Sequence, residues 1–150
     1  MGYLLDTNVI SELTKPQPNQ GLVDWFWDNE GFCTSTISIS ELYCGIMRLP
    51  EGKRKTALKQ HTDALVRDLE GSVLPFDVSC SYACAELRHK AHLAGRTPSA
   101  EDLMIAAIAK AGNHTVVTRN VRDFEYLGVK VLNPFDYQPR MVELPSDETN

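Results

Sequence analysis

Short β-prone apolar runs alternate with helix-forming segments along the chain, and this alternation constrains the fold more than any other feature. The predicted strands cover residues 3–5, 32–37, 73–76, 115–118 and 129–132. The predicted helices cover about 8–13, 21–29, 38–49, 52–70, 79–94 and 101–111, with Gly or Pro ending most of them. This order favours a parallel sheet with right-handed crossovers and a ligand site beyond the carboxyl ends of its strands. We therefore predict an α/β domain with three layers, α/β/α, and a central parallel sheet.

The chain's 150 residues and 43% hydrophobic content fit one domain with a sizeable core. We assign residues 1–137 to that domain and expect the acidic residues 138–150 to be a disordered tail. The sequence has no apolar run of the length that spans a membrane and does not begin like a signal peptide, so we expect a soluble, cytoplasmic protein. The four cysteines form no C-x-x-C pair and are expected to be reduced and largely buried.

The net charge of −5 argues against a protein that holds nucleic acid by bulk electrostatic attraction. Any contact with nucleic acid must then be local. Arg119 and Arg122 lie in the loop after the fourth predicted strand and are candidates for contacting phosphate. The basic run 53–55 is expected to be a solvated helix face.

Three acids lie next to apolar segments, where a carboxylate calls for a structural or functional explanation. Asp6 directly follows the first predicted strand, and Glu41 and Asp102 lie beside apolar helical runs. Each has a structural alternative. Asp6 can cap the helix that follows it, Glu41 completes a capping box with Ser38, and Asp102 completes one with Ser99.

The joint pattern of these acids predicts a site for a hard cation. Asp102 begins a helix that is apolar nearly all round and hence buried, so its first turn brings an acid to the edge of the sheet. Clustered carboxylates repel one another, and each raises the pKa of the others unless a cation compensates. Because only oxygen ligands are offered, we expect Mg²⁺, with Mn²⁺ as a possible substitute.

The predicted chemistry is phosphodiester hydrolysis by a metal-activated water. Asp6 and Asp102 are the expected main ligands, and Glu41 is either a further ligand or the general base. The polar residues expected to orient the carboxylates or to contact substrate are Thr7, Asn8, Thr118, Arg119, Asn120 and Arg122.

The chain resembles the PIN-domain ribonucleases, and most closely the VapC-like and FitB-like toxins of bacterial type II toxin-antitoxin systems. The resemblance is carried by LLDTNVI at 4–10, SISEL at 38–42, DLMIAA at 102–107 and VVTRNVRDF at 116–124. It implies a PIN-like fold over residues 1–137 and Mg²⁺-dependent endonucleolytic cleavage of RNA. It also implies a homodimer that a small DNA-binding antitoxin inhibits, in some cases within a larger toxin-antitoxin hetero-oligomer.

The resemblance matches Asp6, Glu41 and Asp102 to three of the family's acids, and leaves the fourth position open between Asn120 and Asp123. Asp123 would complete the catalytic acids. Two other functions compete with the nuclease. One is a non-catalytic PIN-fold domain that regulates or binds a protein, for which the capping roles suffice. The other is a haloacid-dehalogenase-like phosphohydrolase, which needs an acid where this chain has Asn8.

Overall fold

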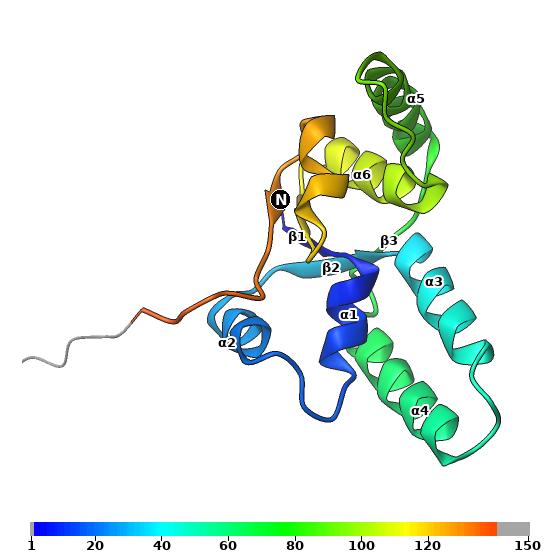
Figure 1. Cartoon of the computed structure of the whole chain (residues 1–150), viewed down its shortest axis with the longest axis vertical. Coiled ribbons are helices and arrows are strands. Elements are labelled where there is room, and N and C mark those ends of the chain that lie inside the picture. Colours follow the sequence, from blue (N-terminus) through cyan, green and yellow to red (C-terminus); the bar gives the residue numbers. More distant parts are fainter. Residues whose placement is uncertain (1, 141–150) are drawn as a thin grey trace, which may run out of the picture.

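A parallel sheet of five strands forms the middle of the molecule (Figure 1). The computed structural model describes residues 2–140, so residues 141–150 of the predicted tail lie outside the described residues. The strands are β1 (Tyr3–Leu5), β2 (Phe32–Ser35), β3 (Val73–Leu74), β4 (Thr115–Val117) and β5 (Val131–Leu132). Their order is β3-β2-β1-β4-β5, and every neighbouring pair is parallel.

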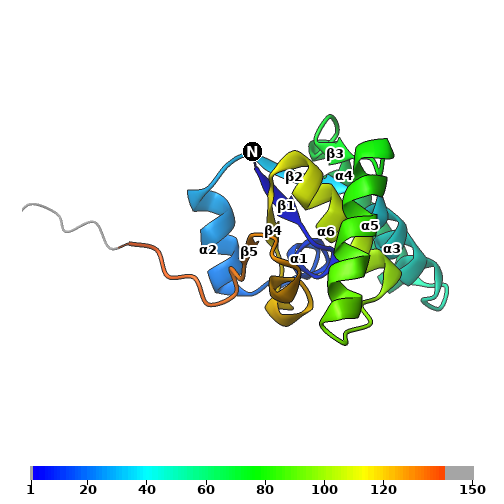
Figure 2. The ribbon, with the colours of Figure 1, turned by 90° about the horizontal axis from the view of Figure 1, so that it is seen from above.

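Helices cover both faces of this sheet, so the predicted three-layer α/β/α architecture is confirmed. The α-helices are α1 (Thr7–Leu13), α2 (Gln20–Asp28), α3 (Thr36–Met47), α4 (Lys53–Asp68), α5 (Val78–Leu93) and α6 (Ala100–Gly112). Two short 3₁₀ segments follow β4, η1 (Val121–Asp123) and η2 (Glu125–Leu127). Helices α5 and α6 lie side by side over one face (Figure 2), while α1 and α2 pack on the other.

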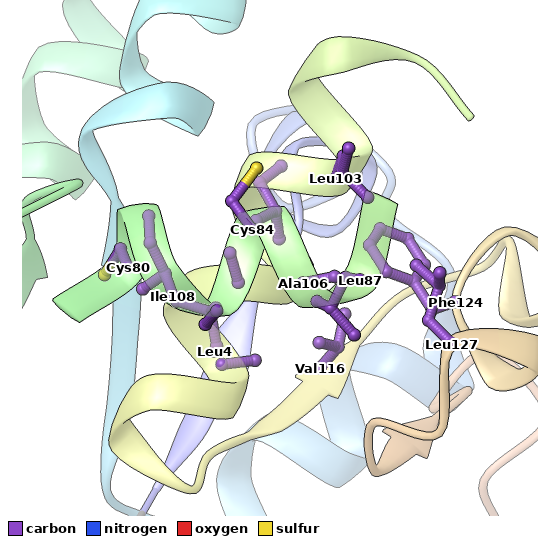
Figure 3. Close-up of a cluster of buried hydrophobic side chains, with 14 of the residues drawn as sticks. Leu4, Cys80, Cys84, Leu87, Leu103, Ala106, Ile108, Val116, Phe124 and Leu127 are labelled. Atoms are coloured by element: carbon purple, nitrogen blue, oxygen red, sulfur yellow. The ribbon is translucent and has the colours of Figure 1, made fainter. Parts of the chain in front are cut away.

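The two faces of the sheet have separate hydrophobic cores because successive side chains of a strand point to opposite faces. Leu4 and Val116 belong to the core under α5 and α6, whereas Leu5 and Val117 belong to the core under α1 and α2. All four side chains are completely buried. Figure 3 shows the first core, which Phe124 from the loop after β4 helps to close. Burial on both faces is typical of central parallel strands.

Several predicted boundaries were wrong at the ends of elements. The strand predicted over 32–37 ends at Ser35, because the Ser35 side chain accepts a hydrogen bond from the Ser38 backbone N–H at 3.0 Å and so begins α3 at Thr36. The strand predicted over 129–132 contains only Val131 and Leu132. The left-handed residue that ends α6 is Asn113, with φ of 53°, rather than Gly112.

The cysteine prediction is confirmed at three positions and wrong at one. Cys33, Cys80 and Cys84 are buried, whereas Cys44 is exposed on α3. All four are free thiols. Among residues 2–140, no helix has the length and apolar character needed to cross a membrane.

Candidate active site

Asp6 and Thr118 are neighbours because each follows the last residue of a central strand. Leu5 and Val117 are register partners in β1 and β4, and the Asp6 backbone N–H donates to the Val117 carbonyl at 2.9 Å. The two side chains therefore emerge at the same C-terminal edge of the sheet. There the buried Thr118 hydroxyl donates to Asp6 Oδ2 at 2.8 Å.

The Asp6 carboxylate is only 5% exposed, and its two oxygens have different partners. Oδ1 accepts from the Thr7 backbone N–H at 2.8 Å, so the prediction that Asp6 caps α1 is confirmed. Oδ2 accepts from Thr118 and, at 3.3 Å, from Asn8 Nδ2. Burial raises the pKa of Asp6, the hydrogen bonds from Thr118 and Thr7 oppose that rise, and the charge of Asp123 adds to it.

Glu41 lies in α3 and reaches toward the start of α1. The Thr7 hydroxyl donates to Glu41 Oε1 at 2.7 Å. Burial raises the pKa of Glu41, and the charges of Asp6 and Glu101 raise it further. The capping box with Ser38 was wrong: Ser35 caps α3, so Glu41 lies beyond the first turn and has no capping role.

Asp102 lies in the first turn of α6, as predicted. Ser99 is the N-cap, and its hydroxyl oxygen accepts from the Asp102 backbone N–H at 3.1 Å, so this half of the capping box is confirmed. The pKa of Asp102 is nevertheless raised to about 6. Burial is the largest cause, followed by the charge of Asp6, with Asp123 and Glu41 adding to it.

The fourth acidic position has two candidates in the loop after β4, and they lie in different surroundings. Asp123 is partly buried in η1, and its negative charge raises the pKa of both Asp6 and Asp102. Asn120 is exposed, and its backbone N–H donates to Thr118 Oγ1 at 3.0 Å. Asp123 is therefore the acid of this loop whose charge acts on both Asp6 and Asp102.

The four carboxylates of Asp6, Glu41, Asp102 and Asp123, hereafter the acid cluster, come from four separate segments and influence one another electrostatically. Among the residues that the structure describes, no Lys or Arg is a cause of the pKa shifts of Asp6, Glu41 and Asp102. Within residues 2–140, no three Asp, Glu, His or Cys side chains stand close enough together to ligate one ion. The cluster is thus a concentration of negative charge rather than a complete set of metal ligands.

Asn8 connects the loop after β4 to the start of α1. Its Nδ2 donates to Thr118 Oγ1 at 3.1 Å, and its Oδ1 accepts from the Arg119 backbone N–H at 3.1 Å. The Thr118 hydroxyl therefore donates to Asp6 and accepts from both Asn8 and Asn120. This network fixes the orientation of the Asp6 carboxylate.

The two candidate arginines differ in what they contact. The Arg119 guanidinium lies 4.0 Å from the centre of the Phe135 ring and 3.8 Å from Glu12 Oε2, so it already has partners away from the acid cluster. Arg122 is exposed. Glu12, which sequence reasoning missed, is a buried acid that also pairs with Lys15 at 2.6 Å. One feature of the sequence indicates that Glu12 lies near the site: it follows Asn8 by four residues and so shares a face of α1 with it.

Comparison with known proteins places the chain in a family. The PIN domain model matches residues 3–130, and the chain belongs to the PIN-domain family. Within that family its sequence and fold are similar to those of proteins named as VapC and FitB.

Three relatives and one solved structure carry this assignment. The plasmid stability protein StbB of Pseudomonas syringae pv. tomato is 42% identical, covering 89% of this chain and 98% of the relative. The VapC ribonuclease Y4jK of Sinorhizobium fredii is 37% identical (89% and 97%), and the toxin FitB of Neisseria gonorrhoeae is 39% identical (88% and 97%). The structure of FitAB bound to the IR36 DNA fragment superposes with a TM-score of 0.84 and 35% identity, covering 91% of this chain and 98% of that one.

Proposed function

We propose that this protein is a Mg²⁺-dependent endoribonuclease toxin. The observation that carries the proposal is the acid cluster: its carboxylates come from the N-cap of α1 and from α3, α6 and η1, and their charges help to raise the pKa of Asp6, Glu41 and Asp102. Among residues 2–140, no basic side chain is among the causes that lower these three pKa values. Such an arrangement is costly unless a cation binds. The relatives named as a ribonuclease and a toxin supply the reaction class.

The donor chemistry of the cluster fits Mg²⁺, which binds through one or two carboxylates, keeps several waters and completes its shell with phosphate oxygens. Asp6 and Asp102 would be the main ligands, with Glu41 nearby, and Mn²⁺ could substitute. A bound ion would supply a water of lowered pKa and would stabilise charge on the phosphoryl group. Because no three acidic side chains within residues 2–140 are close enough to share an ion, these carboxylates would have to move toward one another to bind it.

The protein's own groups would prepare the hydrolysis. Thr118 and the Thr7 backbone N–H hold Asp6 in one orientation. The Thr7 hydroxyl engages Glu41 Oε1, which leaves Oε2 to accept the proton of the attacking water. A raised pKa suits Glu41 for that role, because proton transfer is most effective when the base titrates near the working pH. We assign the fourth acidic position to Asp123, whose charge acts on both Asp6 and Asp102, rather than to Asn120.

A non-catalytic PIN-fold binding domain is the second candidate, and one observation favours it: Asp6 and Ser99 do cap helices, as in any well-formed α/β domain. Glu41 does not fit that account, because it caps nothing. The haloacid-dehalogenase alternative is wrong, since the chain belongs to the PIN-domain family and Asn8 donates a hydrogen bond to Asp6 where that chemistry needs an acid.

An RNA cleavage assay tests the nuclease. Wild type should cut defined single-stranded RNAs with Mg²⁺ or Mn²⁺ and not with a chelator, while Asp6→Asn and Asp102→Asn should lose activity. Glu125→Gln removes an exposed acid two residues after Asp123 and serves as the matched control, with activity retained. The ion should also raise the melting temperature of wild type and of the control, but not of Asp6→Asn. Cleavage by Asp6→Asn at the wild-type rate would refute the proposal.

We further propose that a small DNA-binding antitoxin binds and inhibits this protein and that the toxin is a homodimer. The likeness to FitAB bound to DNA and to the toxin FitB supports the partner. Co-expression with the protein of the adjacent reading frame should yield a complex with reduced RNA cleavage. Light scattering that finds only monomer would contradict the dimer.

A further inference from the structure

The guanidinium of Arg96 is held in one place in the loop between α5 and α6. The left-handed Gly95, with φ of 68°, ends α5, and the Arg96 backbone N–H donates to the Ala91 carbonyl at 2.9 Å. The Arg96 guanidinium carbon lies 4.0 Å from the centre of the Tyr126 ring, and Nη2 donates to the Arg122 carbonyl at 3.3 Å. Backbone and side chain are thus both restrained.

Tyr126 brings this guanidinium to the border of the acid cluster. It lies in η2, directly after the η1 segment that contains Asp123, and its ring packs against the core that includes Leu103 of α6. Burial is the largest cause that raises the pKa of its phenol; the Arg96 charge lowers that pKa, and the charges of Asp102 and Asp123 raise it. Through its hydrogen bond to the Arg122 carbonyl, the Arg96 guanidinium therefore lies beside the η1 turn that contains Asp123.

Arg96 keeps its charge available, in contrast to Arg119. Arg119 has the carboxylate of the buried Glu12 3.8 Å from its guanidinium, whereas no carboxylate within residues 2–140 forms an ion pair with Arg96. In the part of the chain from residue 2 to residue 140, Arg96 forms no ion pair, and only one of its side-chain N–H groups is engaged. A guanidinium stacked on a ring keeps its edge for bidentate contact with a phosphate.

The electrostatics of the site call for such a group. The chain carries a net charge of −5 and the acid cluster is itself negative, so both repel an RNA strand. A fixed, unpaired cation at the border of the cluster offsets that repulsion locally. We propose that Arg96, positioned by Tyr126, binds a phosphodiester group of the RNA strand next to the one that is cleaved. This inference rests on the proposed nuclease function and adds a substrate-binding residue to it.

Steady-state cleavage of a short RNA over a range of salt concentrations tests the assignment. Arg96→Ala should raise KM about tenfold or more, as expected for a lost hydrogen bond to a charged group, with kcat nearly unchanged. The slope of log affinity against log salt should become shallower by about 0.7, the value for one phosphate contact on a single strand. Arg96→Lys should restore the slope but only part of the affinity, because lysine lacks the planar guanidinium.

Tyr126 provides a readout that separates positioning from charge. Tyr126→Phe keeps the ring and should resemble wild type, whereas Tyr126→Leu should raise KM and leave the salt slope unchanged, because the Arg96 charge remains. The control is Arg67→Ala, which removes an exposed arginine from α4 that lines a separate cavity with Tyr43 and Asp63. It should change neither quantity.

The outcomes distinguish this inference from the function on which it rests. If wild type cleaves with Mg²⁺ and Arg96→Ala has the KM and salt slope of wild type, the assignment of Arg96 is wrong and the nuclease stands. A fall in kcat at unchanged KM also overturns the assignment, since it would place Arg96 in the chemical step. If wild type shows no metal-dependent cleavage or RNA binding, both proposals fail. Thermal melts of each variant verify that it is folded.

Discussion

Replacement of Asp102 by Asn should stabilise the metal-free protein at neutral pH. The pKa of Asp102 rises in the folded chain from its ordinary value of 3.8 to about 6, chiefly through burial and the charge of Asp6. The difference corresponds to about 3 kcal/mol, because each tenfold change in proton affinity is worth about 1.4 kcal/mol. Since the neighbouring acids titrate together with Asp102, we expect about 1–3 kcal/mol to be measured.

The sign of this effect follows from proton linkage. Between about pH 4 and 6 the folded state binds more protons at Asp102 than the unfolded state, so the free energy of unfolding falls as the pH rises. Above that window the whole cost of the ionised, buried carboxylate is present. Asn removes that cost, so the stability gain of Asp102→Asn should be full at pH 7.5 and should disappear near pH 4.

Urea denaturation in a chelating buffer from pH 4 to 8 measures this gain directly. A gain of 1–3 kcal/mol corresponds to a rise in melting temperature of very roughly 2–12 °C for a domain of this size. The exposed Glu125→Gln should show no pH-dependent gain in stability. Mg²⁺ should narrow the stability difference between wild type and Asp102→Asn, because it should stabilise wild type and not that variant. A gain that is equal at pH 4 and 7.5, or a variant less stable than wild type at pH 7.5, would show that Asp102 is not held at an electrostatic cost.

Three further substitutions test the structural account. Thr118→Val removes the hydroxyl that donates to Asp6 and accepts from Asn120, so it should lower the free energy of unfolding by about 1–3 kcal/mol and slow RNA cleavage. An unchanged urea midpoint and cleavage rate would contradict the role of this hydroxyl in orienting Asp6. Ser35→Ala removes the N-cap of α3 and should cost about 1 kcal/mol in the same assay, whereas no loss would place the start of the helix elsewhere. Leu4→Ala should cost about 2–5 kcal/mol, because Leu4 is completely buried in the core under α5 and α6, and a smaller loss would mean that the neighbouring side chains fill the cavity.

The sheet and its edge could be predicted from sequence because they depend on local patterns. The apolar strand 3–5 with an acid directly after it, and the predicted strand 115–118, predict that Asp6 and the loop after Thr118 lie at one edge of a parallel sheet. The structure shortens the second strand to Thr115–Val117, so the Thr118 side chain itself emerges at that edge. The ends of the strands and helices were harder to predict. Thr36 and Ile37 are β-branched and favour a strand, but the hydrogen bond from Ser38 N–H to Ser35 draws them into α3. The cap at Ser35 therefore outweighed the weaker strand preference of Thr36 and Ile37.

The partners of charged side chains could not be predicted, because tertiary packing decides them. The sequence favoured Arg119 as a phosphate contact. Its guanidinium instead lies between Glu12, 107 positions earlier in the chain, and Phe135, 16 positions later. The position of Arg96 depends on Tyr126, which follows it by 30 residues, and no periodicity relates the two. The choice between Asn120 and Asp123 likewise depends on the 3₁₀ turn over 121–123.

Capping and metal binding are compatible roles for these acids, and the hydrogen bonds show why. At Asp6, the cap uses Oδ1 alone, while Oδ2 faces Thr118 and Asn8. At Asp102, the cap is a hydrogen bond from the Asp102 backbone N–H to the Ser99 hydroxyl oxygen. The Asp102 carboxylate takes no part in that bond. A helix N-terminus favours a negative charge, which should lower the pKa of Asp102. The pKa instead rises to about 6, so burial and the charges of Asp6, Asp123 and Glu41 together outweigh that favourable field. This concentration of negative charge is what the proposed cation would compensate.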